Sequence, residues 1–334
     1  MVAVCDILHP LAEDVADRFN IRHVFSSYRT MMNETQPDVV HITTPPHTHA
    51  EIGFEAIAGG CHIYLEKPFG LNYQQAEEIV QAAKARGVIV CAGFSQLYDL
   101  VSARAREYIG SGKLGEVVHI ESFYGNSHDG NFSRLFLNDP EHWINKLPGR
   151  LFQNIISHPL YHITPYLTEP VEKVQCLAFD RSANSIFFDE LRVMLQAGGV
   201  TGYLTFTSGV KPITQFVRIY GTRAIAEIDL ANHAFRFYST TQFPGPAARV
   251  YNLIRAGKQS AIEGMRHAKQ MWSGKDRFFA GMGNLFAAFY DNIRQGNLMP
   301  PIDYNEVLKV SSIMDEICRQ CRELEVKQRE GSFN

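Results

Sequence analysis

Short apolar runs alternate with amphipathic stretches over the first hundred residues. The runs are rich in Val, Ile and Leu, which favours buried strands, and the stretches between them have the period and the Pro, Asn and Gly boundary residues of helices. Strands separated by helices of about 10–15 residues predict βαβ units and a parallel sheet that is covered on both faces. We expect strands at 2–5, 38–43, 61–65 and 88–91, and helices at 10–19, 47–58 and 72–87.

The pattern changes after about residue 115, where strand-like segments follow one another with short glycine-containing turns. Consecutive strands with tight links predict a mostly antiparallel sheet. One helix at 151–167 interrupts the strands, helices are expected at 277–295 and 305–324, and the basic stretch 240–275 is interpreted as helical. Residues 328–334 look like a frayed tail. The expected strands are 116–124, 171–179, 186–196, 200–207, 216–220, 224–228 and 234–238.

These patterns predict an α/β protein in two parts. We expect a doubly wound parallel sheet in residues 1–112. An α+β domain with a large, mainly antiparallel open sheet is expected in residues 113–334, with C-terminal helices that could pack back on the first part.

Composition and charge exclude several classes of protein. The chain of 334 residues is 45% hydrophobic and 20% charged, as in folded domains, and 32 basic against 35 acidic residues give a net charge of −3. That balance carries no electrostatic signature of nucleic acid or an anionic membrane as a partner. The N-terminus does not resemble a signal peptide, and six scattered cysteines form no disulfide framework. We therefore expect a cytoplasmic protein with reduced thiols and neither of those partners.

Two motifs carry a family resemblance. Residues 38–51 (DVVHITTPPHTHAE) form a strand that ends in a Thr-Pro-Pro turn, and Glu66-Lys67-Pro68 follows after 14 intervening residues. The combination resembles the Gfo/Idh/MocA family of NAD(P)-dependent oxidoreductases, which act mostly on sugars and cyclitols, and the resemblance covers nearly the whole chain. It is supported by residues 113–117 (KLGEV), by Trp143 ahead of Gly149, and by Asn154 and His158.

The resemblance implies an NAD-dependent dehydrogenase or reductase. Its reaction would transfer a hydride between NAD and a hydroxyl or keto carbon of a sugar, sugar derivative or cyclitol. Residues 1–112 would form a partial Rossmann-type domain that binds the dinucleotide, and residues 113–334 would bind the substrate and form the oligomer contacts.

One departure from the family concerns the start of the chain. The family opens with a strand, a G-x-G-x-x-G turn and a helix, but residues 2–6 match the family's second strand, so the chain begins about 30 residues late. In the strand order 3-2-1-4-5-6 the first strand lies between the second and the fourth, and its absence leaves two strand edges unpaired. Three interpretations compete: a mis-assigned start or a truncated chain, a natural short form with lost or altered cofactor binding, and a rearranged sheet that closes the gap.

The resemblance places a dinucleotide at the carboxyl ends of the strands. Asp6 would accept hydrogen bonds from the adenosine ribose, and because no Arg follows it to meet a 2′-phosphate, NAD is favoured over NADP. The alternative for Asp6 is a turn Asp that caps the next helix. The alternative for the Thr-Pro-Pro turn is a rigid turn that makes no cofactor contact. The other expected cofactor contacts are Thr43, Thr44, Pro45, His49, Glu66, Lys67 and Pro68.

Lys67 is the expected acid/base, because an ammonium at a strand end can stabilise alkoxide character and exchange a proton with an alcohol. Asn154 and His158 lie four residues apart and would share one face of the expected helix. The family commonly has Asp where Asn154 stands, and an amide cannot hold a negative charge. This difference shifts the expected acid–base work toward Lys67 with His158. The alternatives are a surface Lys in a salt bridge and a structural helix His.

The expected substrate side combines charged and aromatic residues. His158 and His162 have a spacing that could hold a metal, but with no third ligand in the pattern we expect none. One face of the large sheet, rich in Val, Leu and Phe, is expected to pack against another subunit and form a homo-oligomer. The expected substrate contacts are Lys67, Tyr98, Asn126, Trp143, Asn154, His158 and His162.

Two other functions compete with a sugar dehydrogenase. A non-catalytic ligand- or cofactor-sensing regulatory protein on the same fold is favoured by the missing glycine turn and by Asn154, since a fold does not fix a function. A weaker alternative is an oxidoreductase for an aromatic diol.

Overall fold

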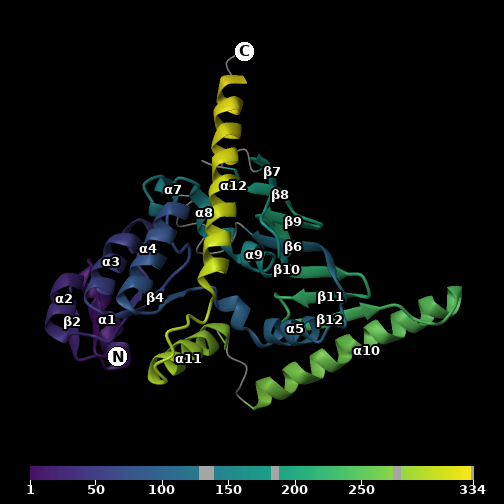
Figure 1. The fold of residues 1–334 in the computed structure, drawn as a ribbon, viewed down its shortest axis with the longest axis horizontal. Coiled ribbons are helices and arrows are strands. Elements are labelled where there is room, and N and C mark those ends of the chain that lie inside the picture. The colour runs from purple at the N-terminus through teal and green to yellow at the C-terminus, as the bar shows by residue number, and fades with distance from the viewer. Residues whose placement is uncertain (128–138, 182–187, 274–279, 332–334) are drawn as a thin grey trace.

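The structure, a computed structural model, describes residues 1–127, 139–181, 188–273 and 280–331. Figure 1 shows two sheet-containing parts with the long helix α12 (Tyr304–Gly331) between them. Parallel strands flanked by helices form the N-terminal part. The second part is built around one large sheet. The expected α/β class, with a Rossmann-like parallel part and a large, mainly antiparallel sheet, is confirmed.

A three-stranded parallel sheet in the order β3-β4-β5 forms the buried centre of the N-terminal part. Its strands are continuous apolar runs because helices cover the sheet, and Ile63, Leu65 and Val90 are fully buried. The Asn72 side chain caps helix α4 by accepting from the main-chain N–H of Gln75 at 2.8 Å, as the sequence predicts. The elements are β3 (Val39–Ile42), η1 (Pro46–Thr48), α3 (His49–Ala58), β4 (His62–Leu65), α4 (Tyr73–Arg86) and β5 (Val90–Ala92).

A separate parallel pair, β1-β2, precedes this sheet. Within residues 1–127 no ladder joins β1 to β3, so the interpretation that a rearranged sheet closes the gap is wrong. Around this pair the apolar side chains of Ile7, Leu8 and Phe19 are 58–87% exposed, in contrast to the β3–β5 core. The elements are β1 (Ala3–Cys5), α1 (His9–Phe19), β2 (His23–Phe25) and α2 (Tyr28–Thr35).

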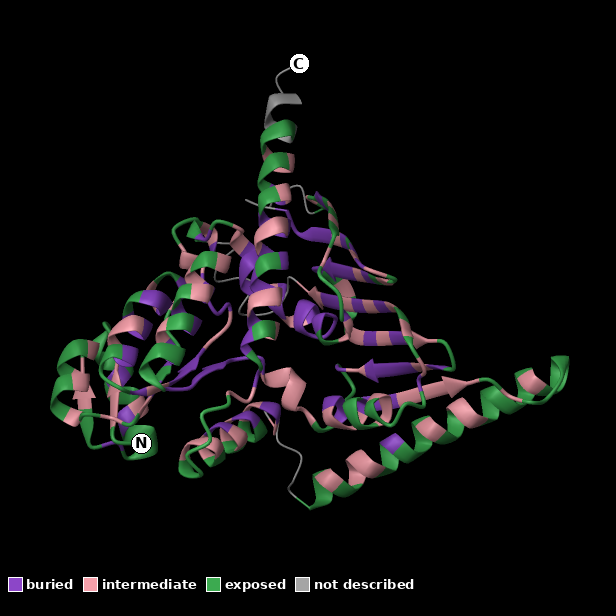
Figure 2. Ribbon diagram, viewed as in Figure 1, coloured by how far each residue is buried: buried purple, intermediate pink, exposed green. Residues whose placement is uncertain are grey.

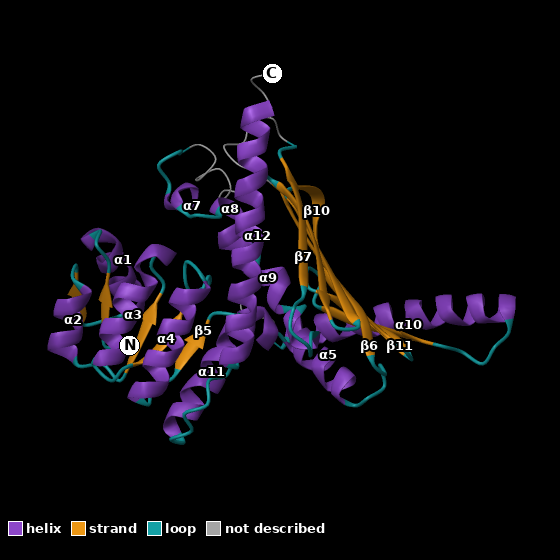
Figure 3. Cartoon of the chain, turned by 45° about the horizontal axis from the view of Figure 1, so that its top comes forward, coloured by secondary structure: helices purple, strands orange, loops and turns teal. Residues whose placement is uncertain are grey.

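The second part is built on a seven-stranded sheet in the order β12-β11-β10-β6-β9-β8-β7. Five of its six strand pairs are antiparallel and β6 pairs with β9 in parallel, which confirms the expected mostly antiparallel sheet. Figure 3 shows α9 and α12 along one side of this sheet. The strands are β6 (Val117–Ser127), β7 (Lys173–Phe179), β8 (Glu190–Ala197), β9 (Val200–Thr207), β10 (Gly209–Gly221), β11 (Ala224–Asp229) and β12 (Ala234–Ser239).

The single helix expected at 151–167 is wrong. The segment consists of α8 (Arg150–Ile155), α9 (Ser157–Tyr161) and η3 (Thr164–Tyr166). Pro159 has no main-chain N–H to donate to the carbonyl of residue 155, and Pro165 has none to donate to that of residue 161. A continuous α-helix therefore cannot form across this segment. Asn154 and His158 therefore lie on two successive short helices rather than on one.

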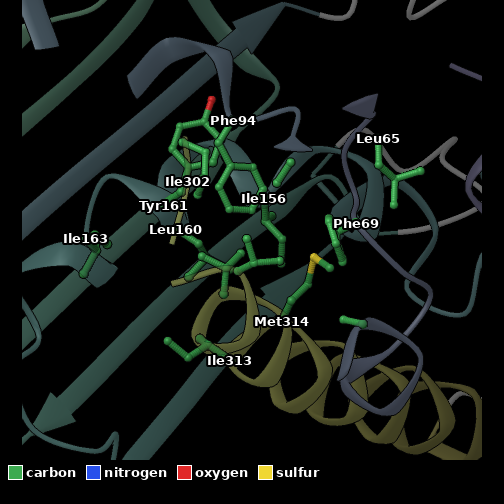
Figure 4. Packing of buried hydrophobic residues seen from close by; sticks show 14 of the residues in the cluster. Leu65, Phe69, Phe94, Ile156, Leu160, Tyr161, Ile163, Ile302, Ile313 and Met314 are labelled. Atoms are coloured by element: carbon green, nitrogen blue, oxygen red, sulfur yellow. The ribbon is translucent and has the colours of Figure 1, made fainter. Parts of the chain in front are cut away.

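Helix α12 joins the two parts. The main-chain N–H of Tyr73, at the start of α4, donates to Asp315 at 2.6 Å, and that of Val90 donates to the Tyr304 hydroxyl at 2.9 Å. Figure 4 shows the apolar side chains that meet between α9, α12 and the turn after β4, among them Phe69, Leu160 and Met314. A frayed tail was expected from residue 328. This prediction is wrong for residues 328–331, because α12 continues to Gly331.

The remaining helices surround this frame. The basic stretch expected to be helical is α10, and no helix in the described ranges is long and apolar enough to cross a membrane. Their bounds are η2 (Ser95–Tyr98), α5 (Leu100–Gly110), α7 (Trp143–Lys146), α10 (Gly245–Trp272) and α11 (Ala280–Arg294).

Candidate functional site

The turns that follow β3 and β4 are tied together beneath their surface by His49. Its Nε2 lies 2.8 Å from the main-chain oxygen of Thr44, and its Nδ1 lies 3.0 Å from that of Pro68. Burial lowers the pKa of His49, so the neutral ring donates one of these two hydrogen bonds at neutral pH. His49 is fully buried, with both nitrogens against main-chain oxygens. These contacts hold the two turns in position, and the expected contact of His49 with the cofactor stays a prediction.

Lys67 extends from the turn after β4 to the second part of the molecule. Its Nζ donates to the main-chain oxygen of Asn154 at 2.9 Å and lies 3.3 Å from the Asn154 side-chain oxygen. Burial lowers the pKa of the Lys67 amine, and the nearby Glu66 carboxylate opposes that shift. The amine is thus held in the interior by two neutral oxygens, and not in a salt bridge on the surface.

His158 lies close enough to Lys67 for the two charges to interact. Burial first, and then the ammonium of Lys67 and the ring of His162, hold the pKa of His158 well below its usual range. The His158 ring stacks on Tyr124 of β6, with centroids 5.7 Å apart and planes at 6°. A neutral imidazole in a fixed orientation therefore faces the region of the Lys67 amine.

A hydrogen-bond chain sets the tautomer of His158. Its Nδ1 lies 2.6 Å from the Tyr161 hydroxyl, which donates to the side-chain oxygen of Gln96 at 3.0 Å. Because the hydroxyl gives its only proton to Gln96, Nδ1 of His158 is the donor in the shorter contact. Nε2 then carries the lone pair and is free to accept a proton.

Glu66 supports the same turn from the side of the sheet. Its Oε1 accepts from the Tyr64 hydroxyl at 2.8 Å, and its Oε2 accepts from the main-chain N–H of Lys67 at 3.1 Å. A side chain at Gly93 would meet the Glu66 main chain at 3.2 Å, so a glycine at the end of β5 permits this close approach.

The other expected cofactor residues lie on turns and differ in exposure: Pro68 is buried, and Asp6 and Pro45 are half-buried. Thr43 and Thr44 are exposed after β3, and the Thr44 hydroxyl lies 2.7 Å from that of Thr48. Asp6 follows β1, and its carboxylate accepts from the main-chain N–H of Leu8 at 2.8 Å, as a turn Asp does. One oxygen of that carboxylate is thereby used within the turn.

The expected substrate residues divide into two groups. Asn126 lies two residues beyond Tyr124 on β6, on the same face of the sheet, and accepts from Gln215 at 3.4 Å. His162 is buried beside Tyr161, with ring centroids 4.9 Å apart. Tyr98 instead donates its hydroxyl to the main-chain oxygen of Pro301 at 2.8 Å, and Trp143 lies on α7 against the ring of His142. The structure joins Lys67 to Asn154 by hydrogen bonds and places His158 where the charge of Lys67 lowers its pKa, but Tyr98 and Trp143 are engaged elsewhere.

Two residues of the hydrogen-bond chain that ends at His158 were missed by the sequence reasoning. Gln96 follows β5 at the carboxyl edge of the parallel sheet, the same positional signal that singled out Thr43 and Lys67. Tyr161 carried no comparable signal, because a Tyr three residues after a His occurs in ordinary packed helices as well as in functional sites. Among the described ranges no group of three or more His, Cys, Asp or Glu side chains is arranged to hold a metal ion.

Two family profiles match the chain. Residues 1–94 match the profile of an oxidoreductase family with an NAD-binding Rossmann fold, GFO/IDH/MocA, and residues 102–227 match the GFO/IDH/MocA C-terminal domain. Together the two profiles cover most of the chain, including Lys67, Asn154 and His158.

Curated relatives match over a shorter stretch. D-glucoside 3-dehydrogenase of Escherichia coli is 31% identical over 117 residues, which are 35% of this chain and 33% of the relative. The NAD(+)-dependent scyllo-inositol 2-dehydrogenase of Bacillus subtilis is 29% identical over 123 residues, 37% of this chain and 36% of the relative. The matched stretch thus spans about a third of the length of these curated relatives.

Solved structures match the fold over nearly the whole chain. A levoglucosan dehydrogenase in complex with NADH and levoglucosan aligns with a TM-score of 0.74 and 18% identity, over 96% of this chain and 88% of that one. An inositol dehydrogenase homologue from Azotobacter vinelandii, complexed with NAD+, aligns with a TM-score of 0.73 and 18% identity, over 95% and 86%. At this identity the likeness establishes the fold.

Proposed function

The chain belongs to the GFO/IDH/MocA family of oxidoreductases, and from that premise we propose that it is an NAD-dependent dehydrogenase. Its reaction transfers a hydride between the nicotinamide and a hydroxyl or keto carbon of a sugar, sugar derivative or cyclitol. The observation that carries the proposal is the interior amine of Lys67, held by Asn154 beside the neutral ring of His158 at the carboxyl edge of the parallel sheet. A positioned side chain of this kind can take the proton from an alcohol or return it.

The names of the relatives support the substrate class. D-glucosides, levoglucosan and inositols are rings that carry several hydroxyl groups. Such a ring needs one base at the reacting hydroxyl and amide or imidazole partners for its neighbours. Lys67, His158 and the side chains of Asn154 and Asn126 supply these groups on facing elements.

The residues present fit the two ends of a dinucleotide. Asp6 stands at the end of β1, where a ribose carboxylate partner is needed, and the turns after β3 and β4 bring Thr43, Glu66 and Lys67 to one edge. Among the described residues, the Lys67 amine donates its hydrogen bonds to the two neutral oxygens of Asn154, at the edge where a reacting group would lie. When bound, NAD supplies the carbon that accepts or gives the hydride.

The protein supplies the proton path. The neutral Lys67 amine accepts the proton of the substrate hydroxyl as the C–H bond breaks, and in the reverse direction the ammonium returns it. Its lowered pKa makes the neutral form accessible. Nε2 of His158 accepts a hydrogen bond from a substrate hydroxyl, while Tyr161 fixes the tautomer through Nδ1. Asn154 holds the amine in place and adds no charge.

Titration with NADH, followed by turnover, tests this function. We expect micromolar binding of NADH by nicotinamide fluorescence, and reduction of NAD by members of a panel of sugars and cyclitols. Lys67→Met should retain NADH binding but lose at least about a hundredfold in kcat, as expected for removal of a general acid/base. Lys327→Met, an exposed lysine on α12, is the matched control and should be unchanged. No NADH binding up to millimolar concentration would refute the proposal.

A regulatory role remains the second candidate because of Asn154. An amide in place of a carboxylate beside Lys67 weakens the acid–base pair, and a sensor would need binding but no turnover. Saturable binding of NADH and a sugar, with no hydride transfer across the panel, would favour the sensor.

The assembly and the location are further parts of the proposal. The outward face of the large sheet exposes Leu177, Phe179 and Met194, and beside them the rings of Phe123 and Phe216 stack at 5.4 Å. We propose that this face packs against a second copy of the chain in a cytoplasmic homo-oligomer. Residues 1–112 bind the dinucleotide in this scheme, and residues 113–334 bind the substrate.

A further inference from the structure

The inner face of the large sheet carries three polar side chains next to His158. Tyr124 and Asn126 lie two residues apart on β6, and Gln215 of β10 is the register partner of Tyr124, so the three share one side of the sheet. Figure 2 shows the alternation of buried and less buried residues along the strands of this sheet. Because the Tyr124 ring stacks on His158, this side is the one that faces α9 and the candidate site.

The main chain at Gln215 is fixed from both neighbouring strands. The main-chain N–H of Leu230, just after β11, donates to the Gln215 carbonyl oxygen at 2.8 Å. On the other side, a side chain at Gly125 of β6 would lie 3.0 Å from the main-chain oxygen of Thr214, so a glycine there permits the close approach of β6 and β10. The Gln215 side chain therefore extends from a defined position on the inner face.

The side-chain amide of Gln215 donates in two directions. Its Nε2 donates to the side-chain oxygen of Asn126 at 3.4 Å. Burial raises the pKa of the Tyr124 hydroxyl to about 12, and a hydrogen bond from the Gln215 side chain opposes that shift, so the amide also donates to the Tyr124 oxygen. One amide group can serve both neighbours because it carries two N–H donors. With its pKa raised, Tyr124 keeps its own proton at neutral pH.

This arrangement leaves the donors of both neighbours available for a ligand. Gln215 meets the oxygen of Asn126 and that of Tyr124, so the Asn126 Nδ2 and the Tyr124 O–H point their protons elsewhere. No residue of the described ranges accepts a hydrogen bond from either donor. Asn126 and Gln215 are half-buried, so a small molecule can reach this part of the inner face.

A ring with neighbouring hydroxyl groups has the complementary chemistry. Each hydroxyl offers one proton to donate and two lone pairs to accept. Nε2 of His158 is an acceptor, whereas Tyr124 and Asn126 offer only donors on the strand beside it. One hydroxyl can thus give its proton to His158 while the oxygen of the next hydroxyl accepts from Tyr124 and Asn126.

We propose that Gln215 is a positioning residue of the substrate site, which holds Tyr124 and Asn126 so that their donors meet one ring hydroxyl beside the reacting one. This role rests on the proposed function, since it concerns the binding of the sugar or cyclitol ring. Gln215 acts through its two neighbours and does not itself touch the ring. The alternative is a purely structural amide pair that only joins β6 to β10.

Gln215→Leu distinguishes the two roles. A leucine has a similar size but donates no hydrogen bond, so Asn126 and Tyr124 lose their orientation. For the panel sugar or cyclitol with the highest wild-type kcat/KM, we expect KM to rise about tenfold, the scale of a lost hydrogen bond, while kcat changes by less than about threefold. The affinity for NADH should stay at the wild-type value. Gln81→Leu, the same substitution at an exposed position on α4, is the matched control.

Gln215→Glu keeps the size of the side chain and reverses its hydrogen bonding. A carboxylate only accepts, so it would take the protons of Tyr124 and Asn126 that the substrate needs. We expect KM to rise at least as much as in Gln215→Leu. An unchanged KM in both variants, whatever their melting temperatures, would overturn the proposal and leave Gln215 a structural role. A loss of kcat at unchanged KM would also overturn it. A wild type that reduces no NAD with any member of the panel would instead refute the proposed function, and this role with it.

Monodeoxy analogues of the same substrate supply a positive signal for the contact. In the wild type, the analogue that lacks the hydroxyl beside the reacting one should have a KM about tenfold above that of the parent compound. In Gln215→Leu the same analogue should have nearly the KM of the parent, because the substitution has already removed the contact. Effects of the variant and of the missing hydroxyl that multiply for every analogue would contradict a shared contact.

Discussion

The amine of Lys67 lies 2.9 Å from the main-chain oxygen of Asn154, a residue 87 positions later in the chain. The same amine lies 3.3 Å from the Asn154 side-chain oxygen. Both partners are neutral, so nothing at Asn154 offsets the cost of burying the ammonium, and burial lowers the pKa of Lys67. The relationship connects the two parts of the molecule at the point where the chemistry is proposed to occur.

Asn154→Asp tests whether this neutral partner sets the working pH. A carboxylate beside the amine favours the ammonium and should raise the pKa of Lys67 by about one to three units. Alcohol oxidation needs the neutral amine, so the rising limb of kcat/KM against pH should move upward by the same amount. Asn297→Asp, on the exposed link between α11 and α12, serves as the control. An unmoved limb in Asn154→Asp would show that Lys67 is not the titrating base.

Tyr161→Phe tests the tautomer of His158. Without the hydroxyl, Nδ1 of His158 loses its acceptor at 2.6 Å, and the ring can place its proton on Nε2 instead. We expect kcat to fall about a hundredfold, the lower end of what proton-transfer groups contribute, with little change in the affinity for NADH. The variant Tyr166→Phe, on the next helical turn, should keep the wild-type kcat. Equal kcat in both variants would remove Tyr161 from the proton path.

The sequence predicted the parallel core well because its signals are local and redundant. The apolar runs at 61–65 and 88–91 are flanked by an Asn cap and by glycines that can adopt a positive φ, and each of these features was found in place. Within the candidate site, Lys67 and His158 were predicted from motifs. Their meeting could not be derived, since it depends on how α8 and α9 pack against the turn after β4.

The errors have identifiable physical causes. The expected helix at 151–167 ignored the missing N–H of Pro159. The short elements β2 and α2, of three and eight residues, were not predicted at all. The basic stretch 240–275 was correctly predicted to be helical, but the sequence does not say which face of α10 meets the body. Hydrogen bonds from α10 to Ser239, Phe237 and His233 decide that, and they are visible only in three dimensions.

His162 should make the fold sensitive to acid. The side chain is 3% exposed, its Nε2 has no hydrogen-bond partner among the described residues, and burial lowers its pKa to about 3. Its pKa in the unfolded chain is about 6.5, so below that pH the unfolded chain binds a proton that the folded chain does not. Stability therefore falls as the pH falls from about 6.5 toward 3, by up to about 1.4 kcal/mol per pH unit.

His162→Leu removes the group that binds this proton in the unfolded chain and keeps a side chain of similar volume. Between pH 6.5 and 5 the variant should lose about 2 kcal/mol less unfolding free energy than the wild type, measured by urea titration. His23→Leu, at an exposed position on β2, should lose as much as the wild type. Parallel acid profiles for wild type and His162→Leu would contradict a buried, neutral His162.

Two glycines at the start of α11 should respond in opposite directions to the same substitution. Alanine normally stabilises a helix relative to glycine, by up to about 1 kcal/mol. A methyl group at Gly283 would meet nothing within 4 Å, so Gly283→Ala should raise the melting temperature. A methyl group at Gly281 would lie 2.5 Å from the main-chain oxygen of Ser95 and would overlap the Asp99 carboxylate. Because a main-chain oxygen cannot turn aside, Gly281→Ala should instead cost about 1–3 kcal/mol.

The position of Gly281 also connects stability to the candidate site. Ser95 and Gln96 belong to the same turn, η2, and Gln96 accepts the proton of Tyr161. Displacing η2 at Ser95 should therefore disturb the partner that fixes His158, so Gly281→Ala should lower kcat as well as the melting temperature. Gly283→Ala should leave kcat unchanged. Melting curves and turnover measured on the two variants check both statements, and a Gly281→Ala protein as stable and active as Gly283→Ala would mean that α11 does not press against η2.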